Sequence, residues 1–299
     1  MIPSYGFLLL ASSVAYAAQL QRLSARQDAP IAKSVNSTYS GKYVSAYNQD
    51  VFLGTPFAQP PLGDLRFRRP ISLNTSREGP RDAKEFGYSC FQNYNRTDMS
   101  EDCLTLNVFR PAGINYKTGG LPVIYAGGFY AGSSAEKAYD PNNIISLSEE
   151  LSKPIIAVAL NYRLDVWGYL STPEILAEKE ANAGLMDQRM ALRWIKENIV
   201  GFDGDPNRVT VWGLPAGAQS IGSYLHLFAR RDDMLFHAAV IESGEHIGAA
   251  LQALPVYSEP FENLAKANGC QAAANYNVSD QSPPSHSQLT SPHNFGTQQ

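Results

Sequence analysis

Arg208-Val209-Thr210-Val211-Trp212-Gly213-Leu214-Pro215-Ala216-Gly217 is the stretch that decides the fold of this 299-residue chain. Residues 208–212 predict a strand, and residues 216–228 predict a helix. Between them lies a tight turn that is flanked by Gly213 and Gly217. A strand that passes through a short turn into a helix is the unit from which α/β folds are built.

The middle of the chain repeats this alternation of strands and helices. Residues 154–160 form a continuous apolar run, which is typical of a strand covered on both faces. Shorter strands are predicted at residues 121–125 and 238–241, a helix at 185–199, and a turn at 201–207. The pattern therefore predicts an α/β fold with a mostly parallel central sheet and helices on both faces.

The two ends of the chain differ from this middle. Residues 7–10 are apolar and Ala15-Tyr16-Ala17 has the form of a cleavage site, so residues 1–17 predict a signal peptide. The alternative for this segment is a buried N-terminal helix. Residues 271–299 have a single charged residue and no apolar periodicity, which predicts a disordered tail. One folded domain is expected over residues 18–270.

Charge and hydropathy exclude several classes of partner. The net charge is −4, from 24 Lys and Arg against 28 Asp and Glu, and without a basic tract no nucleic-acid partner is expected. No later stretch reaches the roughly 20 apolar residues of a membrane span. Four N-glycosylation sequons agree with a secreted, extracellular protein, and they begin at Asn36, Asn74, Asn95 and Asn277.

The cysteines are odd in number. In an oxidising compartment Cys90 and Cys103 would close a short loop, which leaves Cys270 without a partner. An unpaired thiol in an exported chain is a first sign that sequence is missing downstream.

Five separate segments carry a resemblance to a known family. They are Phe52-Leu53-Gly54-Thr55-Pro56-Phe57-Ala58-Gln59-Pro60-Pro61 with Gly63-Asp64-Leu65-Arg66-Phe67, then Ser100-Glu101-Asp102-Cys103-Leu104, Asn161-Tyr162-Arg163-Leu164, Asn182-Ala183-Gly184-Leu185 with Asp187-Gln188-Arg189, and Gly204-Asp205-Pro206. In this order, over residues 39–270, they resemble the type-B carboxylesterases, the family of cholinesterases and fungal extracellular lipases. The resemblance implies an α/β-hydrolase fold whose C-terminal half is missing here. It also implies serine chemistry on an ester or lipid-like small molecule, with no metal and no cofactor.

The nucleophile position of that family is changed. The family places its serine in a Gly-x-Ser-x-Gly turn between strand and helix, and here the turn is Gly213-Leu214-Pro215-Ala216-Gly217. Pro215 has no hydroxyl, and its ring holds φ near −65°, whereas the family's serine needs a positive φ. We expect Pro215 to occupy the first turn of the following helix, where its missing N–H costs nothing. Ser220, on that helix, is not expected to replace the serine.

The oxyanion hole is retained only in part. The resemblance maps its backbone N–H groups to Gly127, Gly128 and Ala216. Compared with the family, the strand before Gly127 is short by several residues, and a shortening by an odd number would exchange the two faces of the strand. An ordinary turn at Gly127-Gly128 is the alternative interpretation.

The other members of a catalytic triad are not recognisable. In the family the acid and the histidine follow the serine, but none of the five histidines lies in a block that resembles the family's catalytic region. We interpret all of them as surface or structural residues. They are His226, His237, His246, His286 and His293.

Two ion pairs are implied by the resemblance alone. The family forms buried pairs at the positions of Arg66 with Glu101 and of Arg163 with Asp187, so these four residues are assigned to the scaffold. The same resemblance implies a bonded Cys90–Cys103.

The sequence therefore predicts a secreted, carboxylesterase-like protein that is catalytically inactive. One alternative is an active ester hydrolase whose sequence was mis-assembled or mis-spliced, and another is a non-catalytic extracellular binding protein. The strand at residues 238–241 is apolar and has no charged residue before Glu242. As an edge strand it would favour self-association through an exposed sheet edge.

Overall fold

The computed structural model of this chain describes residues 29–73, 76, 78–93, 96–114, 118–226, 233–244 and 263. Its strands are β1 (Ile31–Lys33), β2 (Thr38–Ser40), β3 (Lys42–Val44), β4 (Gln49–Pro56), β5 (Pro80–Asp82), β6 (Ser89–Cys90), β7 (Met99–Ser100), β8 (Thr105–Pro111), β9 (Thr118–Ile124), β10 (Ile155–Leu160), β11 (Gly204–Gly213) and β12 (Ala238–Ile241). Its helices are η1 (Gly63–Leu65), η2 (Lys137–Tyr139), α2 (Asn142–Glu150), α3 (Asp165–Tyr169), α4 (Pro173–Ala177), α5 (Ala183–Asn198), η3 (Ile199–Phe202) and α6 (Pro215–His226).

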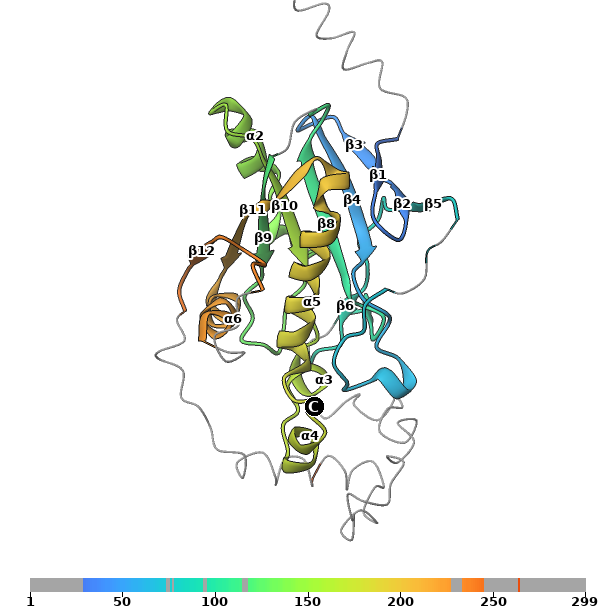
Figure 1. Cartoon of the computed structure of the whole chain (residues 1–299), viewed down its shortest axis with the longest axis vertical. Coiled ribbons are helices and arrows are strands. Elements are labelled where there is room, and N and C mark those ends of the chain that lie inside the picture. The colour runs from blue at the N-terminus through green and yellow to red at the C-terminus, as the bar shows by residue number, and fades with distance from the viewer. Residues whose placement is uncertain are drawn as a thin grey trace, which may run out of the picture.

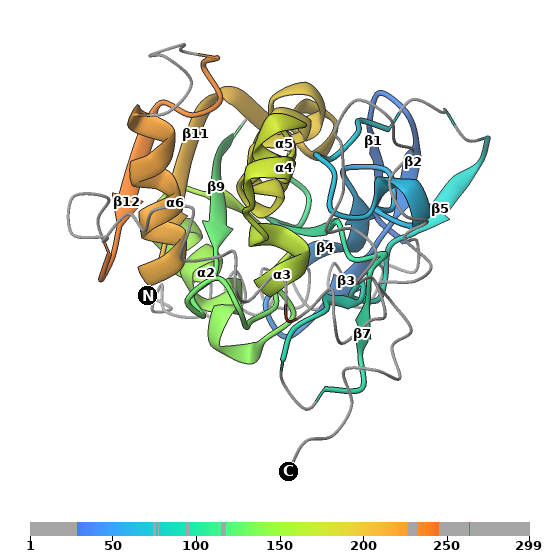
Figure 2. The same ribbon diagram turned by 90° about the horizontal axis from the view of Figure 1, so that it is seen from below.

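A seven-stranded mixed sheet forms the centre of the molecule (Figure 1). Its strand order is β12-β11-β9-β10-β8-β4-β3. The neighbours from β12 to β10 pair in parallel, whereas β8 is antiparallel to both β10 and β4, and β3 is antiparallel to β4. The predicted α/β class is thus confirmed, but the sheet is mixed where a mostly parallel one was expected, because three of its six strand pairs are antiparallel. The small sheet β1-β2-β5 lies at the opposite side of the molecule from β12 and α6 (Figure 2).

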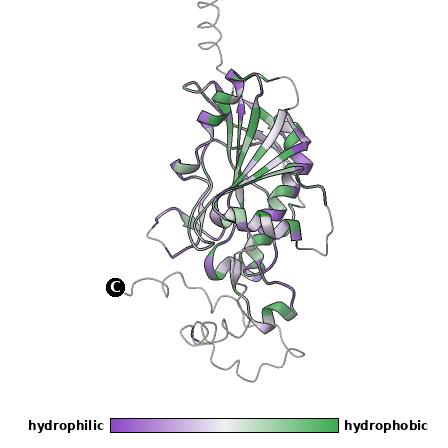
Figure 3. Ribbon diagram, turned by 90° about the vertical axis from the view of Figure 1, so that its left-hand side faces the viewer, coloured by the Kyte–Doolittle hydropathy of each residue, from purple (hydrophilic) through white to green (hydrophobic). Residues whose placement is uncertain are grey.

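Helices cover both faces of the central sheet. Residues of α5 and α6 share one apolar cluster with the strands, and Ile145 of α2 belongs to a second cluster that includes Ala157 and Phe109. Strand β10 faces both clusters, because Ile156 and Val158 lie in the first and Ala157 in the second. The strands of the sheet therefore carry much of the apolar sequence, as the hydropathy colouring shows (Figure 3).

Strand β9 pairs with its neighbour β11 through a bulge. Strand β9 begins at Thr118, three residues earlier than predicted, and stays in continuous register with β10. Against β11, Gly119 lies opposite Asp205 while Gly120 lies opposite Val209. Residues 206–208 therefore have no partner in β9 and form a β-bulge.

Both faces of the end of β9 are covered, because the neighbouring residues Val123 and Ile124 are both buried. The predicted turn at residues 201–207 is wrong in part: η3 ends at Phe202, and β11 already begins at Gly204. The strands at 121–125, 154–160, 208–212 and 238–241 and the helices at 185–199 and 216–228 are otherwise present with shifted ends.

Several predicted features lie outside the described residues. These are the signal peptide at residues 1–17, the tail at 271–299, Cys270, three sequons (Asn74, Asn95 and Asn277) and three histidines (His246, His286 and His293).

Candidate functional site

The turn at Pro215 joins β11 directly to α6. β11 ends at Gly213 and α6 begins at Pro215, so Leu214 alone connects them. The Leu214 N–H donates to the carbonyl of Ile124 in β9 at 3.3 Å, and the Ala218 N–H donates to the carbonyl of Leu214 at 3.0 Å. Pro215 therefore stands at the first position of the helix, where an N–H would have no intrahelical acceptor.

Both glycines of this turn are required by close contacts. A Cβ on Gly217 would lie 2.2 Å from the carbonyl oxygen of Ile124, and one on Gly213 would lie 2.4 Å from the carbonyl carbon of Gly217. Such distances are far below van der Waals contact, so only glycine lets helix, turn and β9 approach in this way. The frame of the turn is thus kept although residue 215 has no side-chain donor or acceptor.

A glycine-run loop follows β9, a few residues beyond Ile124. Three successive residues have positive φ, namely Gly127 (117°), Gly128 (61°) and Phe129 (70°). The carbonyl of Gly127 accepts hydrogen bonds from Tyr130 and Ala131, both at 3.1 Å. In the described part of the chain, the N–H groups of Gly127 and Gly128 have no acceptor, and both residues are exposed.

Gln92 holds the far end of this loop. Its Nε2 donates to the carbonyl of Gly132 at 2.9 Å and to that of Cys90 at 3.0 Å, and the Gly132 N–H donates back to Oε1 at 2.8 Å. Gly132 has a φ of 124°, and a Cβ there would lie 2.6 Å from the ring of Tyr125. The amide of Gln92 thus fixes a backbone position that only glycine can occupy. No sequence pattern pointed to Gln92.

Stacked tyrosines pack beneath the loop. The rings of Tyr125 and Tyr162 are stacked with centroids 4.6 Å apart, and each hydroxyl donates to the backbone carbonyl of the other residue. Burial raises the pKa of both hydroxyls, and also that of Tyr169, whose ring packs against Phe129. These phenols therefore stay neutral. They pack against the loop and do not serve as a general base.

The other candidate nucleophile and bases are engaged elsewhere. Ser220 is fully buried, and its hydroxyl donates to the carbonyl of Ala216 at 3.0 Å. His226 is the last residue of α6, about 16 Å along the helix from Pro215 at 1.5 Å per residue. The Nδ1 of His237 lies 2.7 Å from the carbonyl oxygen of Val209. Neither described histidine can therefore reach residue 215.

Both pairs assigned to the scaffold are in contact. The guanidinium of Arg66 donates to the carboxylate of Glu101 from Nε at 2.5 Å and from Nη2 at 2.6 Å. Arg163 donates to Asp187 from Nε at 2.8 Å and from Nη2 at 2.7 Å, and its backbone N–H adds a third bond of 3.0 Å. Each pair is bidentate, the strongest geometry for such a contact.

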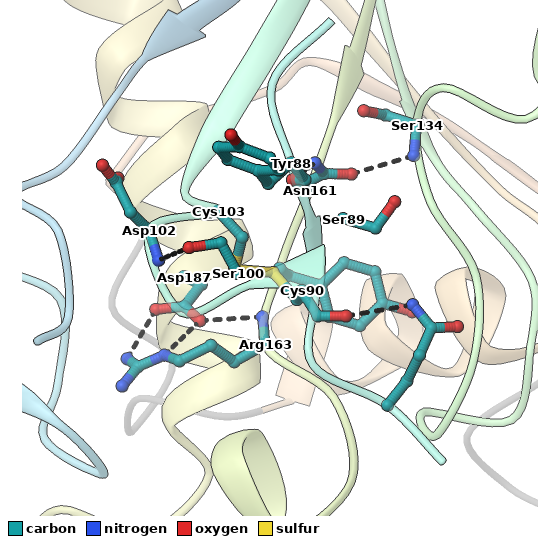
Figure 4. The surroundings of a disulfide bond; sticks show 12 residues. Tyr88, Ser89, Cys90, Ser100, Asp102, Cys103, Ser134, Asn161, Arg163 and Asp187 are labelled. Atoms are coloured by element: carbon teal, nitrogen blue, oxygen red, sulfur yellow. Dashed lines mark hydrogen bonds and ion pairs between the residues drawn. A yellow bond between two sulfur atoms is a disulfide. The ribbon is translucent and has the colours of Figure 1, made fainter. Parts of the chain in front are cut away.

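A disulfide joins Cys90 to Cys103, with their Cα atoms 5.0 Å apart (Figure 4). The loop between the two cysteines is itself tied, because Arg96 and the Ser89 hydroxyl both hydrogen-bond the carboxylate of Asp98. The bonds from Arg96 lower the pKa of Asp98 to about 2, so this carboxylate stays charged at any physiological pH.

A buried polar network next to the disulfide was not expected from the sequence. Asn161 accepts from the Ser134 N–H at 2.9 Å and donates to the Tyr88 carbonyl at 3.0 Å (Figure 4). Asn107 accepts from the Gly54 N–H and donates to the Ser134 hydroxyl, both at 2.9 Å. The one sequence signal for this network was the position of Asn161 inside a segment that resembles the family.

Two kinds of site are not found in the described ranges. No group of three or more His, Cys, Asp or Glu residues there could hold a metal ion. No helix among those residues combines the length and the apolar character that crossing a membrane requires.

A parallel strand that turns through two close-packed glycines into a helix, beside a glycine run after the neighbouring strand, is the arrangement found at the nucleophile turn of α/β hydrolases, and this chain has the fold of that class. Within that class, this chain belongs to the carboxylesterase family, whose family model matches residues 30–285. Lipase 4 of Diutina rugosa is 36% identical over 280 residues, which cover 82% of this chain and 50% of the relative. Acetylcholinesterase of Gallus gallus is 36% identical over 75% of this chain and 28% of its own length.

Solved structures agree with this assignment. EstA of Aspergillus niger superposes with a TM-score of 0.77 at 29% identity, over 91% of this chain and 50% of that chain. PNB esterase gives a TM-score of 0.71 at 30% identity, over 89% of this chain and 52% of the other. The chain thus spans about half the length of the fungal lipases and esterases that it matches.

Proposed function

We propose that this chain is a carboxylesterase-family protein that keeps the frame of the esterase site and does not cleave esters. The observation that carries the proposal is Pro215 at the first position of α6, in the turn where the family has its serine. Without a hydroxyl at this position no acyl-enzyme can form.

The retained frame supports binding without turnover. The N–H groups of Gly127, Gly128 and Ala216 are the oxyanion-hole donors in this proposal. The Leu214–Ile124 hydrogen bond supports their convergence, because it ties the turn before Ala216 to the strand that leads into the glycine run. Donors of this kind stabilise a developing oxyanion, but they need a nucleophile to generate it. An ester or lipid-like small molecule is the ligand class that such a frame fits.

The test is an ester-hydrolysis assay. We expect the purified protein to hydrolyse short-chain aryl esters no faster than buffer does. Pro215→Ser should remain inactive, because a serine without a histidine in reach is a weak nucleophile at neutral pH. Pro215→Ala is the matched control for the effect of removing the ring.

Two outcomes would contradict this proposal. The first is turnover by the unchanged protein that is lost on treatment with an organophosphate, which would support an active hydrolase. The second is turnover that arises in Pro215→Ser but not in Pro215→Ala, which would mean that the base is present and that only the nucleophile was lost.

We also propose that the protein is secreted. A disulfide in the fold and the predicted signal peptide support export, and one relative, 35% identical over 76% of this chain, carries the name Secreted lipase 1 in Botryotinia fuckeliana. Of the predicted glycosylation sites, Asn36 is described: its side-chain amide donates to the carbonyl of Leu73 at 2.8 Å.

Self-association through β12 is a further part of the proposal. β12 is the last strand of the sheet order, and Val240 and Ile241 are 39% and 41% exposed. Among the described residues no strand pairs with its outer edge, and the strand carries no charge that would discourage pairing. An uncovered parallel edge of this kind is a template for a second copy.

Size-exclusion chromatography with light scattering tests the self-association. We expect a dimer or a larger species, and we expect Val240→Lys to shift it towards the monomer by placing a charge on the edge. Leu147→Lys, on the exposed side of α2, is the matched control and should leave the mass unchanged. If the unchanged protein is a monodisperse monomer that unfolds cooperatively on heating, the proposed self-association is wrong.

A further inference from the structure

Strand β12 ends on the turn at Pro215. In the register of the sheet, the last paired residues of β11 and β12 are Gly213 and Ile241. The next residue, Glu242, donates its N–H to the carbonyl of Gly213 at 2.9 Å. Because Gly213 is the first glycine of the turn, the edge strand and the turn share a hydrogen-bonded residue.

The residues after β12 also pack on this turn. A Cβ on Gly244 would lie 2.4 Å from the carbonyl oxygen of Pro215 and 3.1 Å from the Cβ of Ala218, so only glycine fits there. Ser243 has a φ of 58°, which is uncommon for a residue other than glycine and persists only where neighbouring structure holds it. Residues 242–244 are continuous with β12, so their contact with the turn depends on β12 remaining paired with β11.

Strand β12 is held weakly in the sheet. It has four residues, and among the residues that the structure describes its one strand neighbour is β11. Ala238 is half-buried, and the other three residues of β12 are exposed. A short edge strand with few buried contacts opens locally at a low free energy. Opening of β12 would break the hydrogen bond between Glu242 and Gly213 and would release Gly244 from Pro215.

A second copy on the free edge of β12 would oppose this opening. It would give β12 hydrogen bonds on both sides and cover Val240 and Ile241, so the strand could open only after dissociation. We propose that self-association at β12 fixes the turn at Pro215 and the neighbouring N–H of Ala216, and thereby regulates the ester-binding frame. The assembly and the frame are then coupled sites, because the same paired state of β12 stabilises both. This inference rests on the self-association proposed above and requires no ligand.

Hydrogen exchange of the unchanged protein, followed by NMR at several concentrations, tests the coupling. Light scattering gives the monomer fraction at each concentration. The reporters are the amides of Glu242 and Leu214, which donate to the carbonyls of Gly213 and Ile124. Both amides should exchange about ninefold more slowly when the monomer falls from about nine-tenths to about one-tenth of the protein, because opening then requires dissociation.

A reference amide and a glycine variant locate the effect. The Ala112 amide donates to the carbonyl of Asn48, also at 2.9 Å, beside strands β8 and β4 on the other side of the sheet, and its exchange should not depend on concentration. Gly244→Ala should still self-associate, because residue 244 lies outside β12. Its Leu214 amide should exchange fast at every concentration, because the added methyl would push residues 242–244 off the turn. Gly120→Ala, where a Cβ would have no atom within 4 Å, is the matched control and should behave as the unchanged protein does.

Three results would overturn the inference. If the associated protein exchanges its Leu214 amide as fast as the monomer does, association protects the strand without fixing the turn, and the proposed self-association still stands. If Gly244→Ala keeps the concentration dependence of that amide, residues 242–244 do not carry the coupling. If the protein is a monomer at every concentration, the self-association is wrong as well. None of these measurements depends on the esterase assay.

Discussion

Asp187→Ala is expected to lower the free energy of unfolding by about 3–5 kcal/mol, the cost of leaving a buried charge without its partner. Asp187 is fully buried and accepts three hydrogen bonds, all from Arg163. With alanine at position 187, the Arg163 guanidinium would keep its charge in the core but lose both side-chain acceptors on Asp187. Urea denaturation of the variant and the unchanged protein measures the difference.

The control for this prediction is an exposed pair. Asp82 lies 3.1 Å from Lys84 with its side chain 71% exposed, so Asp82→Ala should change the stability by no more than about 1 kcal/mol. Asp187→Asn, which keeps one acceptor oxygen, should fall between the two. Equal effects of Asp187→Ala and Asp82→Ala would show that the Arg163 pair does not stabilise the fold.

Local sequence rules predicted the parallel part of the sheet most clearly at β10 and β12, because these two strands are apolar without interruption. Strand β10 is the clearest case, since a strand buried on both faces cannot hold a polar residue without a partner. Strand β8 is equally buried but contains Asn107 and Arg110. Their partners, which include Gly54 and Asp203, are far away in the sequence, so no local pattern could indicate that these polar residues belong to a core strand.

In the candidate site, too, local features could be predicted from the sequence and long-range contacts could not. The position of Pro215 at the start of α6 followed from a rule about one residue, its missing N–H. The bulge in β11 could not be predicted, because it depends on the register of β11 against β9, a strand more than 80 positions earlier. Gln92 escaped notice for a similar reason: its bonds to Gly132 join positions 40 residues apart.

Removing the disulfide is the second change with a large expected effect. The double variant Cys90→Ala, Cys103→Ala should lose about 3 kcal/mol of stability, the value expected for a closed loop of this length. Replacing both residues avoids a free thiol. The loss should be visible in urea denaturation, and chemical reduction of the unchanged protein should reproduce it.

A second readout separates global stability from the glycine-run loop. Gln92 follows Cys90 by two residues and clamps Gly132, so a freed Cys90 should loosen this clamp and raise the hydrogen-exchange rate of the Gly132 amide. Gln92→Leu keeps the disulfide but removes the acceptor of that amide, and it should raise the same rate. If exchange at Gly132 rises in Gln92→Leu but not in the double cysteine variant, then the disulfide stabilises the chain without positioning the loop, and the clamp is set by Gln92 alone.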